Sequence, residues 1–128
     1  MRSSLFVRAA ALAAALCLGT GVAMSQDAPA KVADGVLVGP NGMTLYTFDR
    51  DAAGSGKSVC NGPCATNWPP LMVTGSAAAS GNWSIVTRDD GQKQWAFKGQ
   101  PVYYWAKDTK PGDKTGNGVN NLWRTATP

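Results

Sequence analysis

The chain has 128 residues, twelve Lys and Arg against eight acidic residues, and no histidine. The absence of histidine excludes a His general base, a Ser-His-Asp triad, an imidazole metal site and a His-ligated haem. Basic residues are scattered singly, which argues against a nucleic-acid partner. We therefore expect no enzyme activity, no cofactor and no resident metal.

Residues 1–25 are typical of a secretory signal peptide. Arg2 and Arg8 precede an Ala- and Leu-rich run that closes on small residues. This pattern predicts cleavage between Ser25 and Gln26. The mature chain would keep ten basic and eight acidic residues, a net charge of +2. It would be periplasmic or secreted and would contain no transmembrane span.

Lipid anchoring at Cys17 is the alternative for this N-terminal segment. Lipoprotein processing usually needs a small residue before the cysteine, whereas Leu16 precedes Cys17. We therefore expect the signal peptide, with Cys17, to be removed.

The mature chain is predicted to be one domain. Residues 26–34 are polar and rich in Ala and Pro, which indicates a flexible leader. Residues 35–128 form a unit of about 100 residues, the size of a single domain. Gly, Pro, Asn or Asp interrupts short apolar runs every 8 to 12 residues, as in all-β domains. We expect a small antiparallel sheet or sandwich of short hairpins.

Two hairpin units follow one another along this domain. In the first, residues 36–38 and 43–48 flank the turn Asn41-Gly42, a strong hairpin signal because both residues tolerate positive φ. The second unit predicts a three-stranded meander and a last strand, over residues 83–87, 94–97, 102–106 and 121–125. Segments 36–48 and 94–106 are similar, so the sequence predicts two related repeats over about 36–74 and 83–127.

Cys60 and Cys64 lie in the long loop between these units. In an oxidising compartment they predict one intramolecular disulfide. The bond would close a small ring and shape the following loop, stabilising the fold by about 2 kcal/mol. The alternative is a redox or metal-handling site, but dithiol oxidoreductases use C-x-x-C rather than the spacing found here.

One motif occurs twice, as "TLYTFDRD" at residues 44–51 and "PVYYWAKD" at residues 101–108. Its residues are Tyr46, Phe48 and Asp51 in the first copy and Tyr103, Trp105 and Asp108 in the second. On a strand the two aromatic residues share one face, while the aspartate falls past the strand, where it can accept loop N–H groups. We interpret the motif as structural; an aromatic surface that grips a sugar or a cation beside the acid is the alternative.

Metal sites are poorly supported. Asp49 and Asp51 begin a stretch that resembles a calcium loop, but Ala53 and Cys60 replace needed oxygen donors. Asp108 and Asp113 could hold only a weak cation. We therefore predict no metal site.

Five tryptophans are many for a domain of this size. Exposed aromatic rings on a rigid β scaffold suit carbohydrate or protein ligands. Trp68, next to Pro69 and Pro70 in the cysteine loop, and Trp123 are the residues that we expect to contact a ligand.

The two motif copies, the segment "VCNGPCATNWPPL" and the ending "PGDKTGNGVNNLW" together resemble a family of secreted bacterial repeats and predicted lipoproteins with a Y-x-aromatic-x-x-D motif. The resemblance covers about residues 32–127. It implies export, paired repeats and an all-β domain, and it supplies no established activity. Two features depart from the family: the lipobox is degraded, and Arg124 follows Trp123 where the family frequently has His.

The sequence as a whole predicts an exported, non-enzymatic binding module of the envelope or periplasm, present as a monomer. Its partner would be a small ligand or an envelope protein. A structural protein-interaction subunit of the cell envelope, and a periplasmic redox or metal-handling accessory using Cys60 and Cys64, are the alternative functions.

Overall fold

Short strands separated by tight turns make up residues 28–128, the part of the chain that the computed structural model describes. In chain order the elements are β1 (Lys31–Ala33), β2 (Val36–Val38), β3 (Tyr46–Phe48), α2 (Pro63–Asn67), β4 (Trp83–Thr87), β5 (Lys93–Phe97), β6 (Gln100–Tyr103), the 3-10 helix η3 (Val119–Asn121) and β7 (Trp123–Thr125). The predicted all-β class is confirmed, with one five-residue α-helix in the described part of the chain. The predicted signal peptide, its cleavage site and Cys17 lie outside the described residues.

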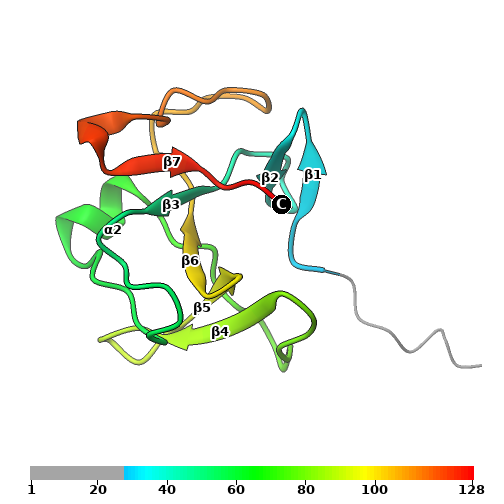
Figure 1. Cartoon of the computed structure of the whole chain (residues 1–128), viewed down its shortest axis with the longest axis vertical. Helices are drawn as coiled ribbons and strands as arrows, with labels where there is room; N and C mark the ends of the chain where they lie inside the picture. Colours follow the sequence, from blue (N-terminus) through cyan, green and yellow to red (C-terminus); the bar gives the residue numbers. More distant parts are fainter. Residues whose placement is uncertain (1–27) are drawn as a thin grey trace, which may run out of the picture.

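The strands form two antiparallel sheets. β1 pairs with β2, and a five-stranded sheet has the order β4-β5-β6-β3-β7. Figure 1 shows β7 running beside β3, with β6 crossing toward β5 and β4. The predicted meander corresponds to β4, β5 and β6. Lys98 and Gly99 join the last two with φ of 50° and 83°, the backbone geometry that a tight hairpin needs.

The N-terminal part of the domain differs from the prediction. Residues 31–33, expected in a flexible leader, form β1 and pair with β2, Lys31 opposite Val38. The expected hairpin of residues 36–38 with 43–48 is reduced to one bridge, between Val38 and Thr44. The reason is that a strand has only two edges: β6 and β7 occupy both edges of β3, and β1 pairs with β2.

Two buried clusters fill the fold. The first consists of Leu37, Leu45, Leu71, Trp83, Trp95, Val102 and Ala126. The second consists of Tyr46, Phe48, Cys60, Trp68, Tyr103 and Trp123. Leu45 and Val102 lie in the first cluster and their neighbours Tyr46 and Tyr103 in the second, as strand alternation requires. All the aromatic motif residues on the strands themselves therefore lie in the second cluster.

Within residues 28–128 there is no helix with the length and apolar character needed to span a membrane.

Candidate functional site

Tyr46 and Tyr103, the tyrosines of the two motif copies, lie opposite each other at the centre of the sheet. They form a register pair between β3 and β6, and neither side chain is exposed to solvent. Because these strands are antiparallel, the two motif copies run in opposite directions from this pair. The copies are thus arranged about an approximate two-fold axis between the tyrosines.

Each tyrosine binds the aspartate of the other copy. The hydroxyl of Tyr46 donates to Oδ2 of Asp108 over 2.6 Å, and the hydroxyl of Tyr103 donates to Oδ2 of Asp51. Both aspartates are buried. Hydrogen bonds to a carboxylate are stronger than those between neutral groups. The motif copies are therefore joined by two reciprocal buried contacts.

The same carboxylates also bond to the loops that follow them. Oδ1 of Asp51 accepts the backbone N–H of Val59 over 2.8 Å. Oδ1 of Asp108 accepts the N–H and the hydroxyl of Thr115, over 3.1 and 2.6 Å. Each aspartate thus connects its own loop to the tyrosine of the other repeat.

Four aromatic rings stack in a continuous row, which we call the aromatic column. Its order is Phe48, Trp123, Trp68, Trp105, with centroid separations of 4.2, 3.7 and 3.8 Å. The two central indole planes are only 2° apart. Tyr46 meets Trp68 edge to face, and Tyr103 meets Trp123 in the same way. Phe48 and Trp105 thus each stack on a tryptophan that lies far away in the sequence.

The column corrects the expectation that Trp68 and Trp123 contact a ligand. Trp68 is 5% exposed and Trp123 is 3% exposed, because neighbouring rings cover both faces of each indole. A Cβ at Gly116 would lie 2.9 Å from the Trp68 ring, so the backbone itself packs against it. Both tryptophans are core residues in this structure.

The carboxylates that start the calcium-like stretch already have partners. The guanidinium of Arg124 donates to both oxygens of Asp49, the shorter bond being 2.7 Å, and Tyr103 donates to Asp51. Asp113 accepts two loop N–H groups and pairs with Lys110 over 2.9 Å. Across residues 28–128 no three His, Cys, Asp or Glu side chains lie close enough to hold a metal together.

Arg88 is a buried cation that the sequence analysis missed. Its Nη1 donates to Oγ of Ser58 and to Oε1 of Gln94, over 3.1 and 2.7 Å. Its Nη2 donates to the carbonyl of Cys60 and to Oδ1 of Asn61, the latter over 3.2 Å. All four acceptors are uncharged. Nothing in the local sequence signals this role, since Arg88 simply precedes a turn.

A chain of hydrogen bonds connects this cation to a motif aspartate. Ser58 and Tyr103 join their hydroxyls over 2.5 Å, and Tyr103 donates its proton to Asp51. Ser58 is therefore the donor to Tyr103 and the acceptor from Arg88. The positive charge of Arg88 and the carboxylate of Asp51 are thus linked through two hydroxyl groups in the core.

The predicted disulfide between Cys60 and Cys64 is confirmed. Cys64 belongs to α2, and its carbonyl accepts the N–H of Trp68 over 2.8 Å. With Arg88 bonded to the Cys60 carbonyl, the ring is held at both ends. The disulfide loop is thereby fixed between the aromatic column and the surface.

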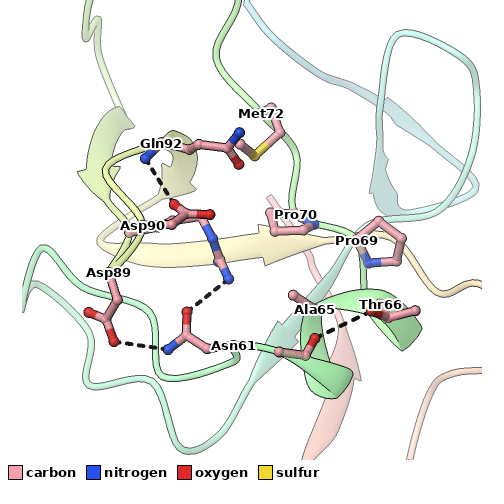
Figure 2. A pocket seen from close by; sticks show the side chains of 11 residues that line it. Asn61, Ala65, Thr66, Pro69, Pro70, Met72, Asp89, Asp90 and Gln92 are labelled. Atoms are coloured by element: carbon pink, nitrogen blue, oxygen red, sulfur yellow. Dashed lines mark hydrogen bonds between the residues drawn. The ribbon is translucent and has the colours of Figure 1, made fainter.

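An open hollow of about 600 Å³, the α2 pocket, lies between α2 and the turn that joins β4 to β5. Its lining residues are Asn61, Gly62, Ala65, Thr66, Pro69, Pro70, Met72, Arg88, Asp89, Asp90 and Gln92. Figure 2 shows the polar side chains of Asn61, Asp89, Asp90 and Gln92 on one side and Ala65, Pro69 and Pro70 on the other. The pocket therefore has one polar and one apolar wall.

Two segments of the chain match the same family, described as a secreted repeat of unknown function: residues 29–72 and residues 84–127. Together they cover more than half of the chain. The chain belongs to this secreted-repeat family. Neither a curated protein nor a solved structure matches the chain.

The family boundaries place the contacts described above between the two secreted repeats. The first repeat begins at residue 29 rather than near the predicted residue 36, and it includes β1. Tyr46, Phe48, Asp51 and Trp68 belong to the first repeat, and Tyr103, Trp105, Asp108 and Trp123 belong to the second. The Tyr–Asp exchange and the column stacking are hence contacts across repeats.

Burial shifts the pKa of one acid, Asp51, and of two phenols, Tyr46 and Tyr103, in this secreted-repeat core. Burial raises the pKa of the Asp51 carboxyl, although bonds from Tyr103 and Val59 and the charge of Arg88 act in the opposite direction. Burial also raises the pKa of the Tyr46 and Tyr103 hydroxyls, and the bond to an aspartate adds to the effect. Both tyrosines therefore stay protonated donors at neutral pH.

The raised pKa of Asp51 predicts a pH dependence. Because the pKa is higher in the folded protein than in the unfolded chain, the stabilising contribution of Asp51 is complete below the unfolded pKa of about 3.9. It is lost as the pH rises through the folded pKa. We expect the unfolding free energy of wild type, relative to Asp51→Asn, to fall as the pH rises from about 3 to about 7. Urea unfolding across this range measures it; a relative gain for wild type would contradict the assignment.

Proposed function

We propose that this protein is an exported, non-enzymatic binding module whose ligand occupies the α2 pocket. The observation that carries the proposal is the pocket itself, about 600 Å³, with amide, carboxylate and guanidinium groups opposite an apolar wall. Ligand sites typically measure about 300–1,000 Å³ and combine apolar surface with a few fixed polar groups. The family description supports secretion, and we propose the periplasm as the compartment after cleavage between Ser25 and Gln26.

The polar wall is already organised in the free protein. The amide of Asn61 bonds at the same time to Arg88 and, over 3.1 Å, to Oδ2 of Asp89. The disulfide restrains the same loop from the other side. Groups that are fixed before binding lose less conformational entropy when a ligand arrives. This rigidity favours a specific ligand over a surface contact.

The chemistry of the pocket favours a small ligand with hydroxyl or amine donors. Asp89 and Asp90 stand at the turn as acceptors, and the side chain of Asp89 is well exposed. The wall of Ala65, Pro69 and Pro70 can pack against the apolar face of a compact ligand. Sugars, amino sugars and short peptides combine these properties.

The proposal assigns no catalytic step to these residues. The chain has no histidine to act as a base near neutral pH. The acids in the core, Asp51 and Asp108, are buried and bonded to tyrosines, which leaves them without access to a substrate. Binding alone accounts for the groups that line the pocket.

Ligand binding at the α2 pocket is tested by nitrogen-15 NMR titration of the mature protein. The panel is chitobiose, glucosamine and dialanine. For at least one of them we expect saturable shifts confined to Asn61, Gly62, Asp90 and Gln92. Asp90→Asn should weaken binding about tenfold, the effect of losing one hydrogen bond to a charged group.

Asp34→Asn is the matched control, because Asp34 is an exposed turn acid outside this pocket. It should leave the affinity unchanged. Shifts that map elsewhere, or no saturable shift with any of the three ligands, would count against the proposal.

A further inference from the structure

The two repeats exchange their C-terminal segments. β3 of the first repeat pairs on one edge with β6 and on the other edge with β7, and both partners belong to the second repeat. Figure 1 shows β7, the red strand at the C-terminal end, lying along β3. The first repeat therefore receives the final strand of the second.

The reverse exchange occurs at β6. Residues 69–71, at the end of the first repeat, lie along β6: Leu71 donates its N–H to the carbonyl of Val102, and Tyr104 donates its N–H to the carbonyl of Pro69. These bonds measure 3.1 and 2.7 Å. The equivalent bond on the other side joins the Ala126 N–H to the Leu45 carbonyl over 2.8 Å. Each repeat thus completes the sheet of the other.

The side chains repeat this pattern. Tyr46 and Tyr103 each depend on an aspartate from the other repeat, and the aromatic column alternates between repeats, Phe48 on Trp123 and Trp68 on Trp105. A repeat separated from its partner would leave a buried hydroxyl without an acceptor, two unpaired strand edges and exposed indole rings. Unsatisfied buried groups and open edges both favour association with a new partner.

The connector between the repeats takes no part in this exchange. Residues 74–82 are mostly exposed, and none of them lies in a named strand or helix. A flexible connector acts by holding its two ends at a high effective concentration, in the millimolar range for short linkers. Apart from Ala77, which packs against the first buried cluster, the connector therefore favours pairing within one chain without supplying contacts of the interface.

We propose that the interface formed by β3, β6 and the aromatic column is a recognition interface in which the first repeat binds a second repeat as its partner. In the intact chain that partner is the covalently attached second repeat. Once the connector is opened, a repeat from one copy of this protein pairs with the complementary repeat of a second copy. Repeat-to-repeat pairing is then a means by which chains of this protein associate.

The test uses the folded, full-length mature protein with a protease recognition sequence inserted between the exposed residues Ala78 and Ala79 of the connector. After cleavage, light scattering on a sizing column should give the mass of the uncut protein, because the repeats stay paired. Elution of two separate halves, folded or unfolded, would overturn the proposal.

Exchange between chains is tested with the same cleaved protein. Nitrogen-15-labelled and unlabelled samples are unfolded in urea with the disulfide intact, mixed and refolded by dilution. Native mass spectrometry should then find mixed pairs at about half of the total. The uncut variant is refolded in parallel and shows how much protein regains its native fold under these conditions. If labelled halves are found only with labelled halves, or no pairs form while the uncut control refolds, recognition between chains is ruled out.

Two variants distinguish pairing that depends on the motif contacts from nonspecific association. Asp108→Ala in the cleaved protein should weaken pairing about 10- to 100-fold, because it removes the partner of Tyr46. Asp34→Asn removes the charge of an exposed acid in the β1–β2 turn, outside the exchange, and should leave pairing unchanged. Equal affinities for the two variants would contradict a role for the reciprocal Tyr–Asp contacts.

Discussion

Replacing Trp68 with alanine is expected to lower the free energy of unfolding by about 3–5 kcal/mol, the range for truncating a large buried aromatic side chain. Trp68 stacks on Trp123 and on Trp105 and receives the edge of Tyr46. Its removal would leave a cavity at the centre of the aromatic column. Because rings from both repeats line that cavity, neither repeat can close it by moving alone.

Urea unfolding of the mature protein measures this effect through the transition midpoint and slope. Trp68→Phe is the matched variant, because it keeps a stacked ring of smaller area. Its free energy of unfolding should fall clearly less than that of the alanine variant. A loss below about 1 kcal/mol for Trp68→Ala would show that the column is not a main source of stability.

Replacing Asp108 with alanine is expected to lower the free energy of unfolding by about 2–3 kcal/mol, which is the second large effect. The change removes the acceptor of the Tyr46 hydroxyl and of two groups of Thr115 at once. Tyr46 is fully buried, so its hydroxyl cannot turn to bulk water. Leaving a buried donor without an acceptor costs about 1–3 kcal/mol, and the lost loop bonds add to it.

A double-mutant cycle identifies the part of this effect that crosses between repeats. Tyr46→Phe and Asp108→Ala, alone and combined, should show a coupling energy of at least about 1 kcal/mol, as contacting residues do. Tyr46→Phe combined with Asp51→Ala is the control, because these residues belong to the same motif copy but do not bond to each other. Coupling within the copy rather than across copies would contradict the exchange.

Local sequence signals predicted much of the fold. Turn residues located β4, β5 and β6 to within a few residues, because Gly, Asn and Asp adopt turn conformations through short-range effects. The two cysteines Cys60 and Cys64, together with the predicted signal peptide, predicted the disulfide that is found. The prediction of a flexible leader was wrong at residues 31–33. These residues form β1 by pairing with β2, a contact that their own sequence does not signal.

The candidate site could be predicted only in part. The sequence directed attention to the loop of Cys60 and Cys64, and the α2 pocket borders that loop. It also pointed to Trp68 and Trp123 as exposed rings, whereas both are buried. The number of aromatic residues follows from the composition, whereas their burial depends on which other residues pack against them in the folded protein. Arg88 carried no signal, because three of its four acceptors come from Ser58, Cys60 and Asn61, far along the chain.

The sequence by itself determined that the chain consists of short strands in two related repeats and that the motif aromatics share one strand face. These properties depend on turn chemistry and on the two-residue period of a strand, which act over a few residues. Only the tertiary structure decided that Tyr46 binds Asp108, 62 residues away, and that Tyr103 binds Asp51, 52 residues away. Within each copy the motif offers a tyrosine and an aspartate five residues apart, and nothing local favours the distant carboxylate. The antiparallel pairing of β3 with β6 brings the distant one into reach.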